Sequence, residues 1–328
     1  MKTEILTMLR ETADYVSGQD LCSRFGVSRT AVWKVINSLK EEGYEIVSTP
    51  RKGYRLAHVP DIVSESELVS RMKTKRLGRQ VVFLRETDST NTQAKRLAED
   101  GASEGTLVVA DMQTAGKGRR GRSWQQRPGT MVSMTLILKP AFAPDKASML
   151  TLIAAHSVAG AIEAATGLPV GIKWPNDIVI HGKKTVGILT EMSLSVEQDS
   201  IHYVVVGIGI NVNIREFPEE ISDMATSLYL ECGRRISRAG LIAEVMKRFE
   251  QDYEVFLQTE DLSGILQEYN AHLAGMDRQV RVLDPAGEFT GVSRGMNQSG
   301  ELLVEKEDGK VVHVYAGEVS VRGLYGYV

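Results

Sequence analysis

The sequence is poor in cysteine, with only Cys22 and Cys232 among 328 residues. Two isolated cysteines exclude a disulfide framework and a cysteine-based zinc site, and they fit a reducing compartment. Long apolar runs are also missing, so we expect no segment that crosses a membrane. The N-terminus starts an amphipathic pattern instead of the apolar core of a signal peptide. These absences predict a cytoplasmic protein with no membrane partner.

The chain also lacks a strong excess of either charge, since 39 basic and 42 acidic side chains give a net charge of −3. Any contact with nucleic acid therefore has to come from a local basic patch. Hydrophobic residues make up 42 % of the chain, which is enough for a sizeable core. The length predicts two or three domains of roughly 100–200 residues each.

Residues 1–60 predict three short helices followed by a hairpin. Ser17 and Ser28 stand where helix N-caps are expected, and Gly26 ends the short helix between them. The residues at 50–53 have the composition of a turn between two short strands. This order of elements is typical of a winged helix-turn-helix.

Residues 24–55 contain seven basic and three acidic side chains. This local excess suits a DNA backbone, because each neutralised phosphate releases counterions. We therefore predict a DNA-binding domain, with a protein-binding winged helix as the alternative. The residues predicted to face DNA lie off the apolar stripe of the second helix of the motif or in the hairpin turn: Ser28, Arg29, Thr30, Trp33, Lys34, Asn37, Arg51 and Lys52.

Residues 61–271 predict a larger domain of α+β class. Ser64 with Glu67 three residues later has the capping-box pattern of a helix start. Strands joined by hairpins, one of them around 181–184, favour a mixed or antiparallel sheet with helices packed on it. We expect strands at 81–84, 106–110, 131–138, 178–180, 185–190 and 203–206, and a long buried helix at 150–165.

Residues 272–328 change to short strands separated by turns that contain glycine. Strands are expected at 280–283, 302–305, 311–314 and 319–321. This pattern predicts a small all-β barrel as the third domain.

The loop at 116–124 combines three glycines with four cations. Glycines let a backbone approach a ligand and expose its amides, and arginine suits phosphate and carboxylate oxygens. The glycine spacing matches a dinucleotide-binding fingerprint, but that fingerprint requires a helix directly after its last glycine. We expect a strand there and reject that fold. From the loop alone, a solvated basic loop or an RNA-binding loop remains an alternative.

Four further segments accompany this loop in a specific order: Asp88–Asn91, Lys173–Asp177, Lys184–Glu191 and Gly207–Asn213. With this order and spacing, essentially the whole chain resembles the bifunctional biotin protein ligase and biotin operon repressor family. The resemblance implies a catalytic domain like those of class II aminoacyl-tRNA synthetases and lipoate ligases. It also implies an SH3-like barrel at the C-terminus.

The resemblance further implies roles for individual residues. Lys184, Arg119 and Asp177 would be catalytic, with Asp177 orienting or deprotonating the acceptor amine or serving only as a supporting carboxylate. The family usually has arginine where this chain has Lys117, which keeps the charge but loses the bidentate fork. Biotin would contact Ser89, Thr90, Asn91, Gln113, Lys117, Gly118, Arg119 and Lys184. ATP would contact Arg119, Arg120, Arg122, Trp124, Asn176 and Asn211.

The implied reaction joins biotin to ATP as biotinyl-5′-AMP and then transfers biotin to a lysine of a biotin carboxyl carrier protein. Positioning and charge stabilisation suffice for it, because the substrate supplies the nucleophile. Mg²⁺ would be held mostly by phosphates and water, without a metal site made by the protein. The adenylate would promote a homodimer that binds operator DNA of the biotin synthesis genes. A lipoate ligase and a biotin sensor without catalytic activity are the alternatives.

Residues 110–128 are expected to order over the adenylate, because four like charges repel one another until an anion neutralises them and because the mixed anhydride needs protection from water. Limited proteolysis should therefore cut within 110–128 more slowly when biotin and ATP are present. Equal cleavage rates with and without the two ligands would count against this expectation.

Overall fold

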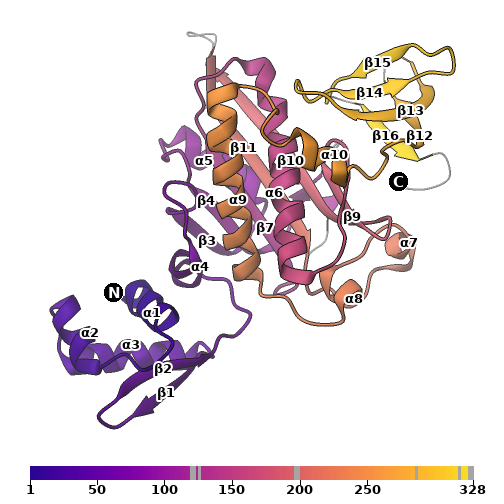
Figure 1. The fold of residues 1–328 in the computed structure, drawn as a ribbon. Coiled ribbons are helices and arrows are strands. Elements are labelled where there is room, and N and C mark those ends of the chain that lie inside the picture. Colours follow the sequence, from indigo (N-terminus) through magenta and orange to yellow (C-terminus); the bar gives the residue numbers. More distant parts are fainter. Residues whose placement is uncertain (119–122, 125–126, 196–199, 285–286, 317–318, 324–328) are drawn as a thin grey trace.

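The computed structural model describes residues 1–118, 123–124, 127–195, 200–284, 287–316 and 319–323. Three parts follow one another along the chain (Figure 1). A helical N-terminal part with a hairpin lies at one end of the molecule. A central sheet with helices on both faces follows, and a smaller C-terminal sheet packs beside it.

The N-terminal part has the predicted winged helix-turn-helix. It consists of α1 (Lys2–Glu11), α2 (Gly18–Phe25), α3 (Arg29–Glu41), β1 (Glu45–Thr49) and β2 (Gly53–His58). The hydroxyl of Ser17 accepts from the amide of Gln19, and that of Ser28 accepts from the amide of Ala31. Gly26 ends α2 with a φ of 63°, a left-handed conformation that glycine adopts without strain. The predicted caps and helix stop are confirmed.

The capping box predicted at Ser64 forms only in part. The Ser64 hydroxyl accepts from the amide of Glu67 at the start of α4 (Glu65–Arg71). The Glu67 carboxylate does not return to the cap but is fully buried, where it accepts from Arg10 of α1 (2.8 Å), Arg71 (2.5 Å) and the hydroxyl of Tyr44 (2.7 Å). Burial and the neighbouring carboxylate raise the pKa of Tyr44. Glu67 therefore ties the winged helix to the central domain.

The central sheet is mixed, as predicted. Its strands lie in the order β3-β4-β7-β11-β10-β9-β8, with β3 and β4 parallel and all other neighbours antiparallel. Each predicted strand is present, and most are longer than expected: β3 (Val81–Thr87), β4 (Leu107–Gln113), β7 (Met131–Leu138), β9 (Asp177–Ile180), β10 (Lys183–Ser195) and β11 (Ser200–Asn211). The edge strand β8 (Gly171–Lys173) was not predicted.

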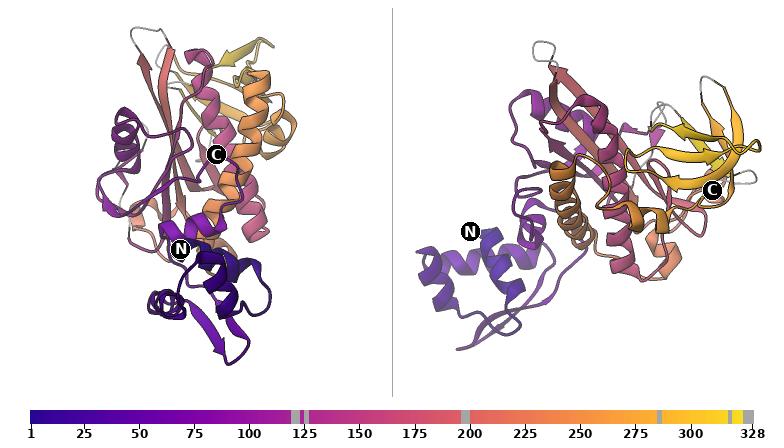
Figure 2. Two further views of the ribbon diagram at one scale, coloured as in Figure 1. Left: turned by 90° about the vertical axis from the view of Figure 1, so that its left-hand side faces the viewer. Right: turned by 45° about the horizontal axis from the view of Figure 1, so that its top comes forward.

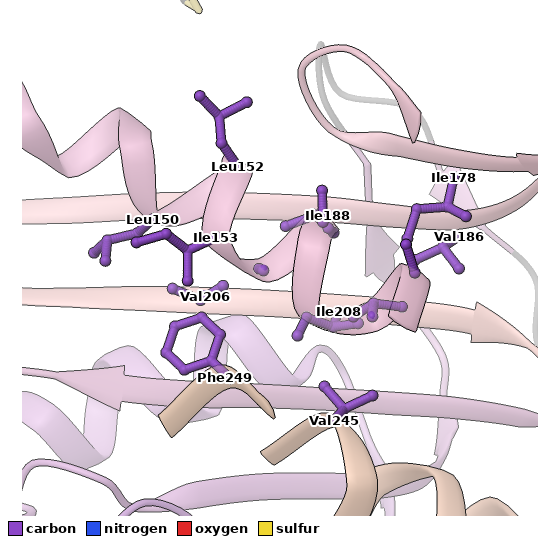
Figure 3. Close-up of a cluster of buried hydrophobic side chains, with 14 of the residues drawn as sticks. Leu150, Leu152, Ile153, Ile178, Val186, Ile188, Val206, Ile208, Val245 and Phe249 are labelled. Atoms are coloured by element: carbon purple, nitrogen blue, oxygen red, sulfur yellow. The ribbon is translucent and has the colours of Figure 1, made fainter. Parts of the chain in front are cut away.

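Helices cover both faces of this sheet (Figure 2). The predicted buried helix, α6 (Met149–Thr166), lies on one face beside α9 (Arg238–Thr259), and α5 (Thr90–Glu99) lies on the other. Figure 3 shows Ile153 and Phe249 packed over Val206 and Ile208 of β11. Burying one such side chain contributes about 1.5–3 kcal/mol. The sequence-based prediction had not included α5, α9 or the shorter helices α7 (Glu219–Ser222), α8 (Leu228–Cys232) and α10 (Leu266–His272).

The expectation that no segment is apolar and long enough to cross a membrane is wrong for Pro144–Thr166, which comprises the 3₁₀ helix η2 (Pro144–Ser148) and α6. This helical segment passes a test of length and composition, but 61 % of its apolar window is buried within the fold. Its contacts with α9 and β10 explain that apolar character as packing in a protein core.

The C-terminal part is an antiparallel sheet with the strand order β15-β14-β13-β12-β16. Its strands are β12 (Gln279–Leu283), β13 (Phe289–Met296), β14 (Leu302–Glu305), β15 (Val311–Val314) and β16 (Ser320–Gly323). Strand β13 was missed because two glycines and two hydroxyl residues weaken its apolar alternation. The indole of Trp174 donates to the carbonyl of Gly300 (3.2 Å) and fastens this sheet to the central domain.

Candidate functional site

One pocket lies where β4, β7, β10 and β11 meet the start of α5 and the two-residue strand β5 (Gly116–Lys117). Nine of the residues predicted to bind biotin or ATP line it: Ser89, Thr90, Asn91, Gln113, Lys117, Gly118, Asn176, Lys184 and Asn211. The structure thus brings together residues that lie up to 122 positions apart in the sequence. The prediction missed other parts of the lining, including Met131, Ser133, Thr185–Leu189 and Gly207–Gly209.

The start of α5 forms one polar wall of the pocket. The amide and the hydroxyl of Thr90 donate to Oε1 of Gln113 at 2.7 and 3.1 Å. Asp88 accepts from the side chain of Gln93 and from the amide of Ser89, both at 2.7 Å, and these hydrogen bonds lower the pKa of Asp88. The buried Ser89 is the N-cap residue of α5, but its side chain makes no cap bond and it lines the pocket.

Asn91 is held on several sides. Its Nδ2 donates to the carbonyl of Leu189 (3.2 Å) and to the carboxylate of Glu191 (2.8 Å), and its Oδ1 accepts from the hydroxyl of Thr135 (2.7 Å). Burial alone would raise the pKa of Glu191, but hydrogen bonds from Lys95 and Asn91 outweigh it and the pKa is lowered. Glu191 and Thr135 therefore orient a pocket residue, a role the sequence signals only as a polar residue within an apolar strand.

Two glycines make room for these side chains. A Cβ atom on Gly207 would lie 2.0 Å from Oδ1 of Asn91, which is far inside contact distance. A Cβ atom on Gly187 would lie 3.3 Å from both Cε and Nζ of Lys184. The glycines of β10 and β11 therefore allow Asn91 and Lys184 to lie directly against the sheet.

Lys184 and Asp177 form an ion pair beside the pocket, with 2.5 Å between Nζ and Oδ1. The Lys184 side chain is 28 % exposed and that of Asp177 is 13 % exposed, so the ammonium group is partly open to a ligand. Asn176 donates to Asp177 and to the carbonyl of Ile188, both at 3.2 Å. Asn211 is buried and donates to the carbonyl of Thr226 at 3.0 Å. A cation with a fixed counter-charge thus lines the pocket.

Four of the predicted ligand contacts rest on the basic glycine loop. Arg119, Arg120 and Arg122, together with the side chain of Trp124, lie outside the described residues. The backbone of β6 (Ser123–Trp124) pairs with β5, and the next regular element after it in the described chain is the strand β7, so the dinucleotide-binding fold is excluded there. Among the described residues no group of three or more His, Cys, Asp or Glu side chains could hold a metal ion.

Comparisons with known proteins agree with this geometry. Residues 83–211 match the model of the biotin/lipoate A/B protein ligase family, 2–55 match an HTH domain, and 276–322 match the biotin protein ligase C terminal domain. The chain is 42 % identical to the bifunctional ligase/repressor BirA of Bacillus subtilis over 94 % of both chains. It belongs to the bifunctional biotin ligase/repressor family.

Two further relatives support this assignment. The Escherichia coli bifunctional ligase/repressor BirA is 29 % identical over 97 % of this chain and 96 % of its own. The biotin protein ligase from Aquifex aeolicus, solved in complex with biotin and ATP, superposes with a TM-score of 0.65 at 33 % identity. That alignment covers 75 % of this chain and 99 % of the Aquifex chain. The resemblance inferred from the sequence motifs is confirmed at the level of the family.

The N-terminal domain of this family member presents most of the residues predicted to face DNA on its surface. Trp33 is 56 % exposed, and Lys34 and Thr30 are exposed beside it on α3, whereas Asn37 is half-buried. A groove between α3 and the β1–β2 turn is lined by Arg29, Arg51 and Lys52 among others. Arg29 also donates to Gln19 (3.0 Å), and Lys52 lies over the ring of Tyr15. Ser28 is exposed and caps α3.

Replacing Gly207 by alanine should destabilise the ligand-free protein by about 1–3 kcal/mol, the usual cost of forcing an extra methyl group into a packed site. The added Cβ would displace Asn91 from the pocket wall. Urea unfolding monitored by circular dichroism would measure the change. Gly209→Ala in the same strand is the matched control, because its Cβ would meet nothing closer than 3.8 Å. Equal stability of the two variants would contradict this account of the wall.

Proposed function

We propose that the chain condenses biotin with ATP to biotinyl-5′-AMP, transfers the biotin to a lysine of a biotin carboxyl carrier protein, and represses biotin synthesis genes when the adenylate accumulates. The observation that carries this proposal is that one pocket is lined both by the Ser89–Asn91 wall with Gln113 and by Lys184, Asn176 and Asn211. One half offers neutral hydrogen-bonding groups to a small polar ring. The other half offers a cation and two amides to a nucleotide.

Adenylation needs a nucleophile, a leaving group and stabilised charge. A carboxylate oxygen of biotin attacks the α-phosphorus of ATP, a new O–P bond forms, and the bond to the β-phosphate oxygen breaks to release pyrophosphate. Lys184 would neutralise the carboxylate and the α-phosphate as they approach, since this residue lines the pocket. Asp177 would hold that ammonium group in place before substrates bind. Mg²⁺ carried by the ATP phosphates would supply further neutralisation.

Transfer moves the biotinyl group from phosphate to nitrogen. The neutral lysine amine of the carrier protein attacks the carbonyl carbon of the mixed anhydride, the C–O bond to AMP breaks, and the nitrogen loses a proton. Asp177 is the carboxylate next to this site and would orient the amine or accept its proton. Arg119, Arg120, Arg122 and Trp124 are proposed to complete the nucleotide side, with Lys117 and Gly118 over biotin.

The remaining parts of the proposal concern architecture and partners. We propose the domain division 1–60, 61–271 and 272–328. The central domain would be related to class II aminoacyl-tRNA synthetases, and the C-terminal sheet would close as an SH3-like barrel. The adenylate would promote a homodimer that presents two winged helices to the operator, because two half-sites multiply DNA affinity. The cytoplasm would supply ATP and keep Cys22 and Cys232 as free thiols.

Replacing Lys184 by methionine should lower the rate of biotin-dependent exchange between pyrophosphate and ATP by about 100-fold or more, the usual effect of removing one stabilising charge from an active site. The matched control is Lys183→Met. This neighbouring ammonium group donates to the carbonyl of Ser222 (3.0 Å) and does not line the pocket. Exchange supported by lipoate but not by biotin would overturn the assignment of the substrate, and an active Lys184→Met enzyme would overturn the role of Lys184.

Biotin and ATP together should strengthen binding of the chain to a DNA fragment that carries the promoter region of the host's biotin synthesis genes. A gel-shift titration with and without the two ligands measures the gain. Arg51→Ala should weaken DNA binding and leave pyrophosphate exchange unchanged, because Arg51 lies in the turn between β1 and β2 of the N-terminal part and does not line the pocket. If the ligands produced no gain with the wild-type chain, the repressor function would be refuted while the ligase function stood.

A further inference from the structure

Arg238 is a buried arginine at the start of α9, and only 3 % of its surface is exposed. Its Nη1 donates to Oδ1 of Asp111 (2.6 Å) and to the carbonyl of Met131 (3.4 Å). Its Nε and its own backbone amide donate to the carboxylate of Asp61 at 3.2 and 2.9 Å, and Nη2 donates to the backbone carbonyl of Asp61 (3.1 Å). One guanidinium group thus joins three segments that are distant in the sequence.

The first of these segments is the connection to the DNA-binding domain. Asp61 lies between the end of β2 at His58 and the start of α4 at Glu65. Its carboxylate also accepts from Nδ2 of Asn213 (2.8 Å), and Asn213 in turn bonds both the amide and the carbonyl of Ile236. The linker is therefore bound to the central domain through a buried charge and a buried amide.

The other two segments lead directly to the pocket. Asp111 lies in β4, two residues before the pocket residue Gln113, and its Oδ1 also accepts from the amide of Gly129 (3.2 Å). Met131 begins β7 and lines the pocket itself. Thr130 precedes Met131 in the chain. Its carbonyl accepts from the amides of Val212 and Asn213, which directly follow the pocket residue Asn211. The ends of β4, β7 and β11 therefore share one support with the linker.

The position of Arg238 depends on both of its carboxylate partners, because its charge is buried. Arg238 is nearly inaccessible, and the carboxylates that neutralise it are 14 % exposed at Asp61 and 25 % exposed at Asp111. A buried cation that loses one partner has no water to replace it, so the group relaxes toward its remaining partner. A displacement of Asp61 would then shift Arg238 relative to Asp111 and Met131, and a displacement of the pocket wall would shift Asp61 in the same way.

We propose that Arg238 is a positioning residue that couples the ligand pocket to the DNA-binding domain, through Asp111 on the pocket side and Asp61 on the linker side. This inference rests on the proposed repressor function and adds the residues that transmit the signal. Because such coupling is reciprocal, the Asp61–Arg238–Asp111 cluster serves ligand affinity as well as operator affinity.

Another contact between the same two domains provides a matched control. Glu67 also joins the winged helix to the central domain, through hydrogen bonds from Arg10 and Tyr44. Within the described residues its side chain bonds no segment that lines the pocket. Glu67→Gln should therefore loosen the DNA-binding domain and weaken operator binding equally with and without ligand. Asp61→Asn, in contrast, should reduce the difference between operator affinity with ligand and operator affinity without ligand.

The experiment uses the full-length chain, the promoter fragment, and biotin with ATP. For each variant, the ratio of operator Kd without ligand to operator Kd with ligand is measured, together with KM for biotin and kcat in pyrophosphate exchange. Asp61→Asn should lower the ratio by at least about fivefold, the lower range of typical coupling between sites. It should also raise KM for biotin, while kcat stays within about twofold because no reacting group is touched. Asp111→Asn should also lower the ratio and raise KM for biotin, because it removes the partner of Arg238 on the pocket side. Thermal melting checks that each variant is folded.

Retention of the wild-type ratio by a folded Asp61→Asn or Asp111→Asn variant would overturn the inference. An equal loss of the ratio in Glu67→Gln would also overturn it, because the effect would then reflect loosening of the domain in general. If biotin and ATP did not increase operator affinity even in the wild-type chain, both the repressor function and the inference would be refuted. If they increased it equally in the wild-type chain and in Asp61→Asn, only the inference would be refuted.

Discussion

The antiparallel pairing of β10 with β11 is the constraint on which the site depends. Its register sets Ile188 opposite Ile208 and Gly187 opposite Gly209. Because successive side chains of a strand point to opposite faces, the isoleucines pack toward α6 and α9 while the glycines leave space on the face of α5. A slip of one residue would exchange the two sets and destroy both the core and the pocket. The same pairing therefore builds the stability of the domain and its ligand site.

Charge compensation within the protein is the second theme. Lys184 forms an ion pair with Asp177, and Glu191 forms one with Lys95. Arg238 is paired with the carboxylates of Asp61 and Asp111. Each partner fixes the position of a group that would otherwise be mobile or too costly to bury. At the pocket this means that cation and amides stand in place before an anion arrives. Such preorganised groups need little reorganisation during the reaction, which is how an enzyme without a nucleophile of its own can accelerate phosphoryl transfer.

Local signals were read correctly from the sequence. These signals are the helix caps at Ser17 and Ser28, the helix stop at Gly26 and the alternating apolar runs. Each acts over a few residues, so it can be recognised without knowing the fold. The motif order also led to the correct family. Strand β13 and the long helix α9 were missed, the first because its glycines mask its alternation and the second because no single motif marks it. The capping role assigned to Glu67 was wrong, since tertiary partners outcompete a local amide for its carboxylate.

The residue types and short spacings of the chain were enough to indicate its chemistry: polar residues at 89–91, a lysine at 184, a basic glycine loop and a winged helix with a local positive charge. Which of these groups lie together follows from the fold. It placed Asn91 against Gly207, paired Lys184 with Asp177, and buried Arg238 between the linker and the pocket. The contacts of Asn91 and Arg238 join segments more than a hundred residues apart, and the pairing of Lys184 with Asp177 depends on the register of β9 against β10. No local pattern predicts either.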